Sequence, residues 1–321
     1  MSPHHRRPAL LAALTAPVLA LSACASTAGD DGTVRALASF YPLQMVLEEV
    51  GGDRIDVDSL TPPGAEPHDV ELSPAQVAAL DAADLVVYQS GFQPSVDDAV
   101  AQTAPEHVVD AADRADLDSA ATHEDEHADD GHAEDEHADD EHADDGHDHD
   151  GLDPHFWLDP TRLAALAGPV ADALSEIDPD GAETYRANAD ALVDRLTDLD
   201  ETYTAALATC ERRVLVTSHE AFGYLADRYD LEQVGISGID PESEPSPARL
   251  REVGDVVRDR GVTTIFFETL ASPKVAQTLA ADLGVETAVL DPIEGVTDDS
   301  QDYFSIAEAN LDALRVALSC S

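Results

Sequence analysis

The sequence predicts an α/β protein in which two lobes, each built on a parallel sheet, are joined by a long rigid helix. Short runs rich in β-branched residues alternate with helical patterns in both halves of the 321-residue chain. Between the halves, Asp180–Thr209 contains no proline and a single glycine near its start. Alternating strands and helices are typical of parallel sheets covered by helices, and an uninterrupted helical pattern is typical of a connecting strut.

The strands follow from short apolar runs that end in turn residues. The first half predicts four strands, at Val34–Phe40, Ile55–Leu60, Leu85–Tyr88 and His107–Asp110, with helices that include Leu43–Val50 and Pro74–Ala82. The second half predicts four more, at Val214–Thr217, Gln233–Ile236, Thr264–Glu268 and Glu286–Leu290. Gly261 and Gly284 mark turns from helix to strand.

The central helix is predicted by apolar residues that recur every three or four positions. These residues are Tyr185, Ala189, Leu192, Leu196, Leu199, Tyr203 and Leu207. At 1.5 Å per residue the whole stretch would span roughly 45 Å. We therefore expect an N-terminal lobe over 33–178, a linking helix over 179–209 and a C-terminal lobe over 210–321.

The first residues indicate export. Residues 1–23 have a basic start and an apolar run, Ala9–Leu21, that is too short for a comfortable membrane span and contains Pro17. Small residues before Cys24 resemble a bacterial lipoprotein cleavage site, with a plain secretory signal as the alternative. We expect residues 24–32 to form a tether and Cys24 to carry lipid on the outer face of the bacterial cell membrane.

Charge and cysteine content restrict the partners. The formal net charge is −50, which argues against nucleic acid, because phosphate contacts need Lys and Arg, and favours cations as ligands. We expect a monomer. With Cys24 assigned to lipid, Cys210 and Cys320 remain, and the oxidising environment of an exported chain favours a disulfide between them.

A low-complexity segment divides the first lobe. Residues 123–150 contain seven His and fifteen Asp or Glu, without Lys or Arg, so they bury little and are expected to be disordered. An acidic solvating loop is the alternative to a loop that gathers metal with modest affinity. The candidate low-affinity ligands are His123, His127, His132, His137, His142, His147 and His149.

Four histidines lie after the leader and outside this segment, and three of them are candidate ligands. His68 lies in a loop after the second strand, and His219 and Asp291 each follow a strand of the second half. Ligands of open α/β sheets bind beyond the carboxyl ends of the strands. Zinc takes imidazole nitrogen and carboxylate oxygen in tetrahedral sets, so a cleft between the lobes would assemble His68, His155, His219 and Asp291. We interpret His107, at the start of a strand, as structural.

Several motifs taken together resemble a known family. They are Ser39–Leu43, Pro63–Asp69, Asp153–Pro160, Thr217–Phe222, Phe267–Glu268 and Leu290–Pro292. In this combination they resemble the zinc-type metal-binding solute-binding lipoproteins of bacterial ABC importers (the ZnuA/TroA-like family) over about residues 34–318. The resemblance implies two α/β lobes, a long connecting helix and a metal site between the lobes.

The resemblance also implies the ligands and the metal. It carries the ligand positions onto His68, His155, His219 and Asp291, with Glu66 or water as the alternative fourth ligand. Manganese-type members have glutamate at the position of His219, whereas zinc-type members have histidine, and a His-rich insertion before His155 is a zinc-type feature. Exchanging carboxylate for imidazole moves a site toward zinc.

Two classes of function follow. The first is a non-enzymatic, high-affinity receptor that delivers Zn2+ to an ABC importer permease, with a manganese receptor of the same family as its alternative. The second is a zinc-dependent hydrolase, because three histidines and an exchangeable position also describe catalytic zinc. No stretch of the sequence predicts the HExxH helix of zinc proteases, so the receptor is the favoured interpretation.

Overall fold

The computed structural model describes residues 33–115, 117, 152–298 and 300–321. The expected signal peptide and tether with Cys24, and the histidine-rich segment 123–150, lie outside the described residues. Thr33–Ser321 belong to one compact unit. Among the described helices, none combines the length and the apolar character needed to cross a membrane.

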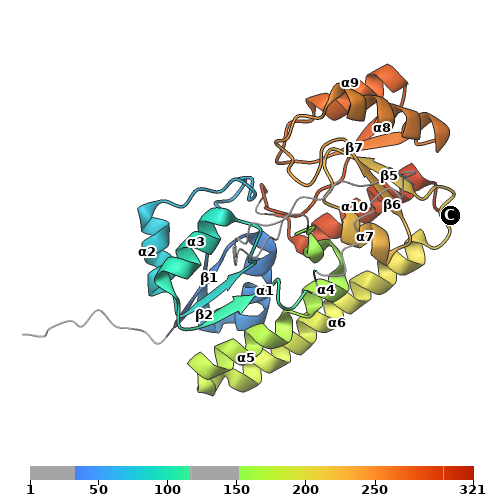
Figure 1. The fold of residues 1–321 in the computed structure, drawn as a ribbon. Helices are drawn as coiled ribbons and strands as arrows, with labels where there is room; N and C mark the ends of the chain where they lie inside the picture. The colour runs from blue at the N-terminus through green and yellow to red at the C-terminus, as the bar shows by residue number, and fades with distance from the viewer. Residues whose placement is uncertain (1–32, 116, 118–151, 299) are drawn as a thin grey trace, which may run out of the picture. The chain divides into compact units, whose positions relative to one another are not determined.

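The N-terminal lobe contains a four-stranded parallel sheet in the order β2-β1-β3-β4 (Figure 1). Its elements are β1 (Val34–Ala38), α1 (Tyr41–Gly51), η1 (Gly52–Arg54), β2 (Ile55–Ser59), α2 (Pro74–Ala82), β3 (Leu85–Tyr88), α3 (Pro94–Thr103) and β4 (Val108–Asp110). The first strand ends earlier than its apolar run, because Phe40 is the N-cap of α1 and Pro42 occupies the first turn of that helix.

The C-terminal lobe repeats this plan in the order β6-β5-β7-β8, again with every pair parallel. Its elements are β5 (Val214–Thr217), α7 (Gly223–Arg228), β6 (Glu232–Gly235), α8 (Pro247–Asp259), β7 (Thr264–Phe267), α9 (Lys274–Leu283), β8 (Glu286–Val289) and α10 (Tyr303–Leu318). The predicted two parallel-sheet lobes are therefore confirmed.

Short helices and one long helix connect the two sheets. They are η3 (Phe156–Leu158), α4 (Pro160–Ala164), α5 (Ala167–Ile177), η4 (Pro179–Gly181) and α6 (Ala182–Leu207). The 26 residues of α6 span about 39 Å, and all seven apolar residues of the predicted stripe are buried. Helix α6 packs against α1, α4 and α5 and also against α10, so it contacts both lobes (Figure 1).

One buried residue of α6 is charged. Asp200 accepts hydrogen bonds from Arg228 Nε at 2.8 Å and Nη2 at 2.6 Å, and from the Tyr229 hydroxyl at 3.1 Å. The hydrogen bonds from Arg228 hold the pKa of Asp200 below its usual range. This ion pair ties α6 to α7 of the C-terminal lobe.

The segment that follows the histidine-rich repeat is attached to both lobes. Trp157 is fully buried, and its indole Nε1 donates to the Pro292 carbonyl at 2.7 Å. The Tyr303 hydroxyl donates to the Trp157 carbonyl at 2.6 Å, while Gln89 Nε2 from the N-terminal lobe donates to the Pro154 carbonyl at 2.9 Å. The buried Trp157 therefore belongs to an apolar core shared by both lobes.

A disulfide closes the C-terminal lobe. Cys210, just after α6, is bonded to Cys320, just after α10, across a sequence separation of 110 residues. The bond joins the end of the linking helix to the last helix of the chain.

Replacing both Cys210 and Cys320 by serine should lower the free energy of unfolding. A loop of 110 residues gives about 4–5 kcal/mol in a chain-entropy treatment, and about 2–4 kcal/mol is typical of measurements. Chemical denaturation of the two proteins measures the difference. Reductant should lower the stability of the wild-type chain and leave that of the double variant unchanged. If neither the two replacements nor the reductant lowered the free energy of unfolding, a stabilising role for the disulfide would be contradicted.

Candidate metal site

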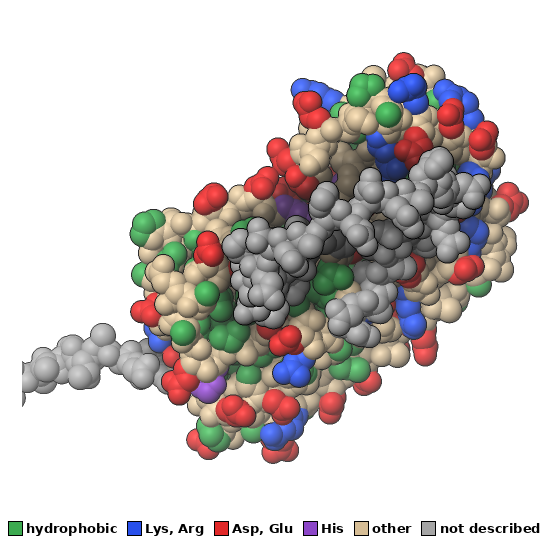
Figure 2. Space-filling model, in the orientation of Figure 1, with side chains coloured by type: hydrophobic (Ala, Val, Ile, Leu, Met, Phe, Trp, Pro, Cys, Tyr) green, Lys and Arg blue, Asp and Glu red, His purple; other side chains and the backbone are tan. Residues whose placement is uncertain are grey.

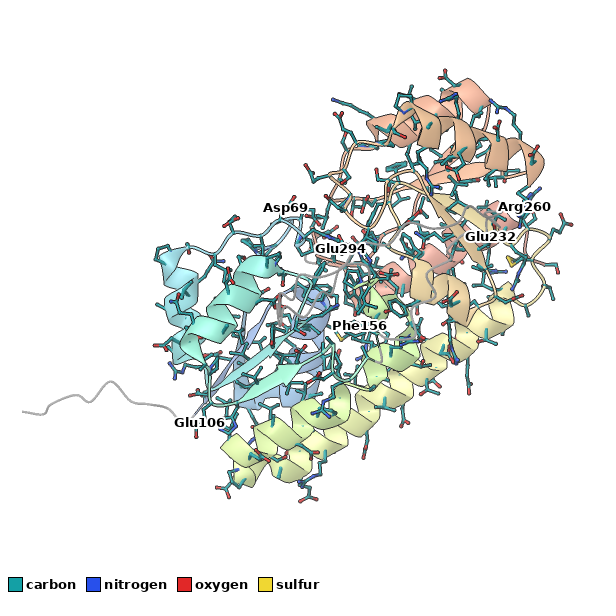
Figure 3. The ribbon with its side chains drawn as sticks, viewed as in Figure 1. Asp69, Glu106, Phe156, Glu232, Arg260 and Glu294 are labelled. Atoms are coloured by element: carbon teal, nitrogen blue, oxygen red, sulfur yellow. A yellow bond between two sulfur atoms is a disulfide. The ribbon has the colours of Figure 1, made fainter. Side chains whose placement is uncertain are left out.

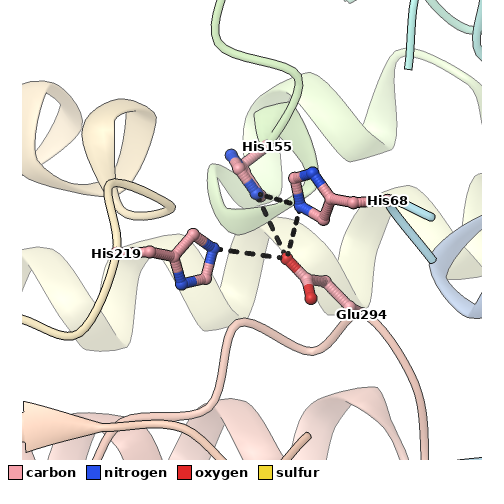
Figure 4. Close-up of side chains that lie close together, drawn as sticks. All are labelled: His68, His155, His219 and Glu294. Carbon is pink, nitrogen blue, oxygen red and sulfur yellow. Dashed lines mark hydrogen bonds and ion pairs between the residues drawn. The ribbon is translucent and has the colours of Figure 1, made fainter. Parts of the chain in front are cut away.

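Three histidines and one glutamate converge between the lobes. One ligand atom from each of His68, His155, His219 and Glu294 lies within 4.8 Å of every other (Figure 4). Glu294 Oε1 lies 3.1 Å from His155 Nε2, 3.4 Å from His68 Nε2 and 3.6 Å from His219 Nε2. The Nε2 atoms of His68 and His155 are 3.3 Å apart. We call these four residues the metal-site group.

The group is assembled at the facing ends of the two sheets. His68 lies in the loop between β2 and α2, His219 follows β5, and Glu294 lies in the segment between β8 and α10. His155 immediately precedes η3. Glu294 lies between the two lobes (Figure 3), and one of the histidine side chains visible in Figure 2 lies next to a group of acidic side chains.

Burial separates the group from solvent on most sides. The side chains of His155 and Glu294 are 0% exposed and that of His219 is 1% exposed, whereas that of His68 is 10% exposed. Charged groups buried to this degree need partners.

Two carboxylates outside the group orient two of its imidazoles. His155 Nδ1 lies 2.6 Å from Asp153 Oδ1, and His219 Nδ1 lies 3.0 Å from Glu268 Oε1. Glu268 Oε1 also accepts from the Ser218 hydroxyl at 2.8 Å. A carboxylate beside Nδ1 keeps the proton of a neutral imidazole there, so the lone pair of Nε2 faces the group.

The electrostatics of the group favour positive charge. Burial alone would lower the pKa of His155, but the neighbouring Asp153 and Glu294 raise it. Burial opposes the charged form of His219 as well, yet its hydrogen bond with Glu268 and the carboxylate of Glu294 nearby raise its pKa to about 10. Burial would raise the pKa of Glu294, but its contacts with the three imidazoles hold it well below its usual range.

The donor atoms fit a tetrahedral cation. Zinc bonds of about 2.0–2.1 Å to nitrogen and oxygen place neighbouring ligand atoms about 3.3–3.4 Å apart. The three distances from Glu294 Oε1 and the distance between His68 and His155, 3.1–3.6 Å, are close to this value. Within the described part of the chain, the buried His219 Nε2 and Glu294 Oε2 have no hydrogen-bond partner. They are not the only such atoms among the described residues, but both belong to the group, and a cation bound there would satisfy His219 Nε2.

The structure brings together the three predicted histidines but not Asp291. One carboxylate oxygen of Asp291 accepts from the Thr269 hydroxyl at 2.6 Å and the other from the Ile293 backbone N–H at 2.8 Å. These contacts direct its carboxylate toward its own loop and toward the loop that follows β7. The carboxylate that joins the group is Glu294, three residues further along the chain, and not Asp291.

The other candidates lie beside the group or away from it. Glu66, the alternative fourth ligand, accepts from the backbone N–H groups of His68 and Asp69, and its Oε1 is 4.0 Å from His68 Nε2. The His107 carbonyl accepts from the Val86 N–H, next to the pairing of β3 with β4. The sequence contained one signal for Glu294, its proximity to the Leu290–Pro292 motif.

Known proteins share both the sequence and the fold. Residues 37–317 match the family described as zinc-uptake complex component A, periplasmic. The high-affinity zinc uptake system protein ZnuA of Bacillus subtilis is 36% identical over 302 residues, 92% of this chain and 90% of that protein. The zinc-binding lipoprotein AdcA of Streptococcus pneumoniae is 36% identical over 314 residues, 95% of this chain.

Coverage and structure agree with the sequence match. The chain spans 60% of the length of that AdcA protein. The crystal structure of the Zn(II)-bound ZnuA-like domain of Streptococcus pneumoniae AdcA superimposes with a TM-score of 0.69 at 32% identity, covering 89% of this chain and 99% of the domain. The family is one of solute-binding proteins and not of enzymes. With a match over 37–317 and the same two-lobed fold, this chain belongs to the ZnuA family of metal-binding receptors.

Proposed function

We propose that this chain is a high-affinity receptor for Zn2+. It is exported, held at the outer face of the cell membrane by lipid on Cys24, and delivers zinc as a monomer to the permease of an ABC importer. The observation that supports this most directly is the buried metal-site group, in which the carboxylate oxygen of Glu294 lies 3.1–3.6 Å from three imidazole nitrogens. His68, His155, His219 and Glu294 are the proposed ligands.

The donor set favours zinc over manganese. Imidazole nitrogen suits zinc, whereas manganese favours carboxylate, carbonyl and water oxygen. The group has a single carboxylate, and the position that distinguishes the two metal types in the resemblance is occupied by His219. The printed names of the relatives described above also refer to zinc.

A receptor accounts for the geometry better than a hydrolase does. Catalytic zinc keeps an open coordination position, whereas four protein ligands complete a tetrahedron. Glu220, adjacent to His219, is the nearest candidate for a general base in the sequence. Its carboxylate instead accepts a hydrogen bond from Arg249 Nη2 at 2.9 Å.

Zinc should outcompete manganese for the purified chain. His219→Glu should lower the ratio of zinc affinity to manganese affinity by about tenfold or more, equivalent to about 1.4 kcal/mol. The reason is that the variant replaces imidazole with a harder oxygen ligand. Competition titration with both metals measures the ratio. His107→Glu makes the same exchange outside the group and should leave the ratio unchanged. A wild-type preference for manganese would contradict the zinc assignment.

Glu294→Gln should weaken zinc binding by more than about 100-fold, beyond the 10–100-fold expected for partners that only orient a ligand. The amide removes the one negative charge that the group contributes. Glu66→Gln is the matched control and should stay within about tenfold of wild type, because Glu66 contacts backbone N–H groups and not the centre of the group. Equal losses in the two variants would favour Glu66 as a ligand.

Deleting residues 123–150 should leave one tight zinc site and remove only weaker binding. All four residues of the metal-site group lie outside this segment. Free metal at a thousandfold excess over its dissociation constant stabilises the fold by about 4 kcal/mol, which appears as a rise in Tm. The deletion protein should retain that rise in Tm. His155→Ala in the full chain should keep the weak sites and lose most of the shift. Loss of tight binding on deletion would place the segment in the primary site.

A further inference from the structure

The turn that leads into Glu294 has an unusual backbone conformation. Ile293 has φ of +56°, in the left-handed region that β-branched residues rarely adopt. Its side chain is 1% exposed, so the conformation occurs in the packed interior and not at a loose surface loop. Such a conformation persists only where the surroundings hold it, and it immediately precedes the carboxylate of the metal-site group.

The side chain of Asp291 holds this turn from within. Its Oδ1 accepts from the Ile293 backbone N–H at 2.8 Å, which closes the turn across Pro292. Its Oδ2 accepts from the Thr269 hydroxyl at 2.6 Å. Thr269 is the neighbour of Glu268, which orients His219. The short loop after β7 therefore contains the residue that orients His219 and also contacts Asp291, in the turn that leads to Glu294.

The backbone of the turn is held from two further directions. Asn310 of α10, which is 3% exposed, accepts from the Asp291 N–H at 2.8 Å and donates to the Asp291 carbonyl at 2.7 Å. The Trp157 indole donates to the Pro292 carbonyl at 2.7 Å. Because Trp157 lies two residues after His155, this bond fixes the turn relative to another member of the group.

We propose that Asp291 is a positioning residue that aims Glu294 at the metal by enforcing the left-handed turn at Ile293. This inference rests on the proposed zinc function and adds to it a residue that acts without touching the metal. Glu294 is the only carboxylate of the group, and its Oε1 must lie within about 3.1–3.6 Å of three imidazoles held by other segments. A turn free to return to negative φ at Ile293 would carry the carboxylate away from them.

Three variants test the proposal. Asp291→Ala removes both accepting oxygens and should weaken zinc binding by about 10–100-fold, the range for residues that orient a ligand. Asp291→Asn keeps an oxygen for the Ile293 N–H and should stay within about threefold of wild type. Asp298→Ala is the matched control, because Asp298 accepts in the same way from the Ser300 N–H at an exposed position of the same segment. This control should leave the zinc affinity unchanged.

Spectra and a rescue variant separate positioning from general damage to the fold. The visible spectrum of bound Co2+ reports coordination geometry, and Asp291→Ala should alter it while the metal-free protein still unfolds cooperatively. Glycine adopts positive φ freely, so adding Ile293→Gly to Asp291→Ala should restore much of the wild-type Co2+ spectrum.

Each outcome bears on a stated claim. Wild-type affinity and spectrum in Asp291→Ala would overturn the positioning role. An Asp291→Asn variant as weak as Glu294→Gln would make Asp291 a ligand and would also overturn it. Failure of the glycine variant to restore the spectrum would show that Asp291 does not act through the turn. Failure of the wild-type chain to bind zinc would instead refute the proposed function.

Discussion

A buried carboxylate sets the chemistry of the region between the lobes. The side chain of Glu294 is 0% exposed, and an unpaired carboxylate in such a place is strongly destabilising. Protons on the surrounding imidazoles supply the missing positive charge. Asp153 raises the pKa of His155 and Glu268 that of His219, Glu294 adds to both effects, and the three imidazoles lower the pKa of Glu294. A divalent cation supplies the same charge while the imidazoles become neutral. Metal binding and proton release are therefore one process at this site.

The donor atoms come from both lobes, so their arrangement depends on the contacts that join each lobe to the linking segments. Arg195 of α6 forms an ion pair with Glu49 of α1 at 2.7 Å, and its guanidinium lies 3.9 Å from the ring centroid of Phe304 on α10. Trp157 adds a buried hydrogen bond to Pro292. Arg195 thus joins the linking helix to one element of each lobe, and Trp157 joins the segment after the histidine-rich repeat to the loop that contains Glu294.

The sequence predicted the parts of the molecule that depend on local patterns. The stripe of α6 follows a period of three to four residues, and His68 and His219 follow the carboxyl ends of predicted strands. The choice between Asp291 and Glu294 is different, because both are acidic and both lie in the same loop. It depends on a left-handed turn at Ile293, a residue type that favours the opposite conformation. Asp200 was likewise missed, because its partner Arg228 is 28 residues away.

The four members of the group are held by different means. Carboxylates orient His155 and His219 through Nδ1, and a hydrogen-bonded turn directs Glu294. For His68, no hydrogen bond joins Nδ1 to another residue that the structure describes. Its ring packs edge-on against that of Phe92, with 4.8 Å between the ring centroids. Its loop contains Pro62, Pro63 and Pro67, whose fixed φ angles restrict the backbone. His68 is also the most exposed member, so the group meets solvent at the imidazole whose ring is held by packing and not by a carboxylate at Nδ1.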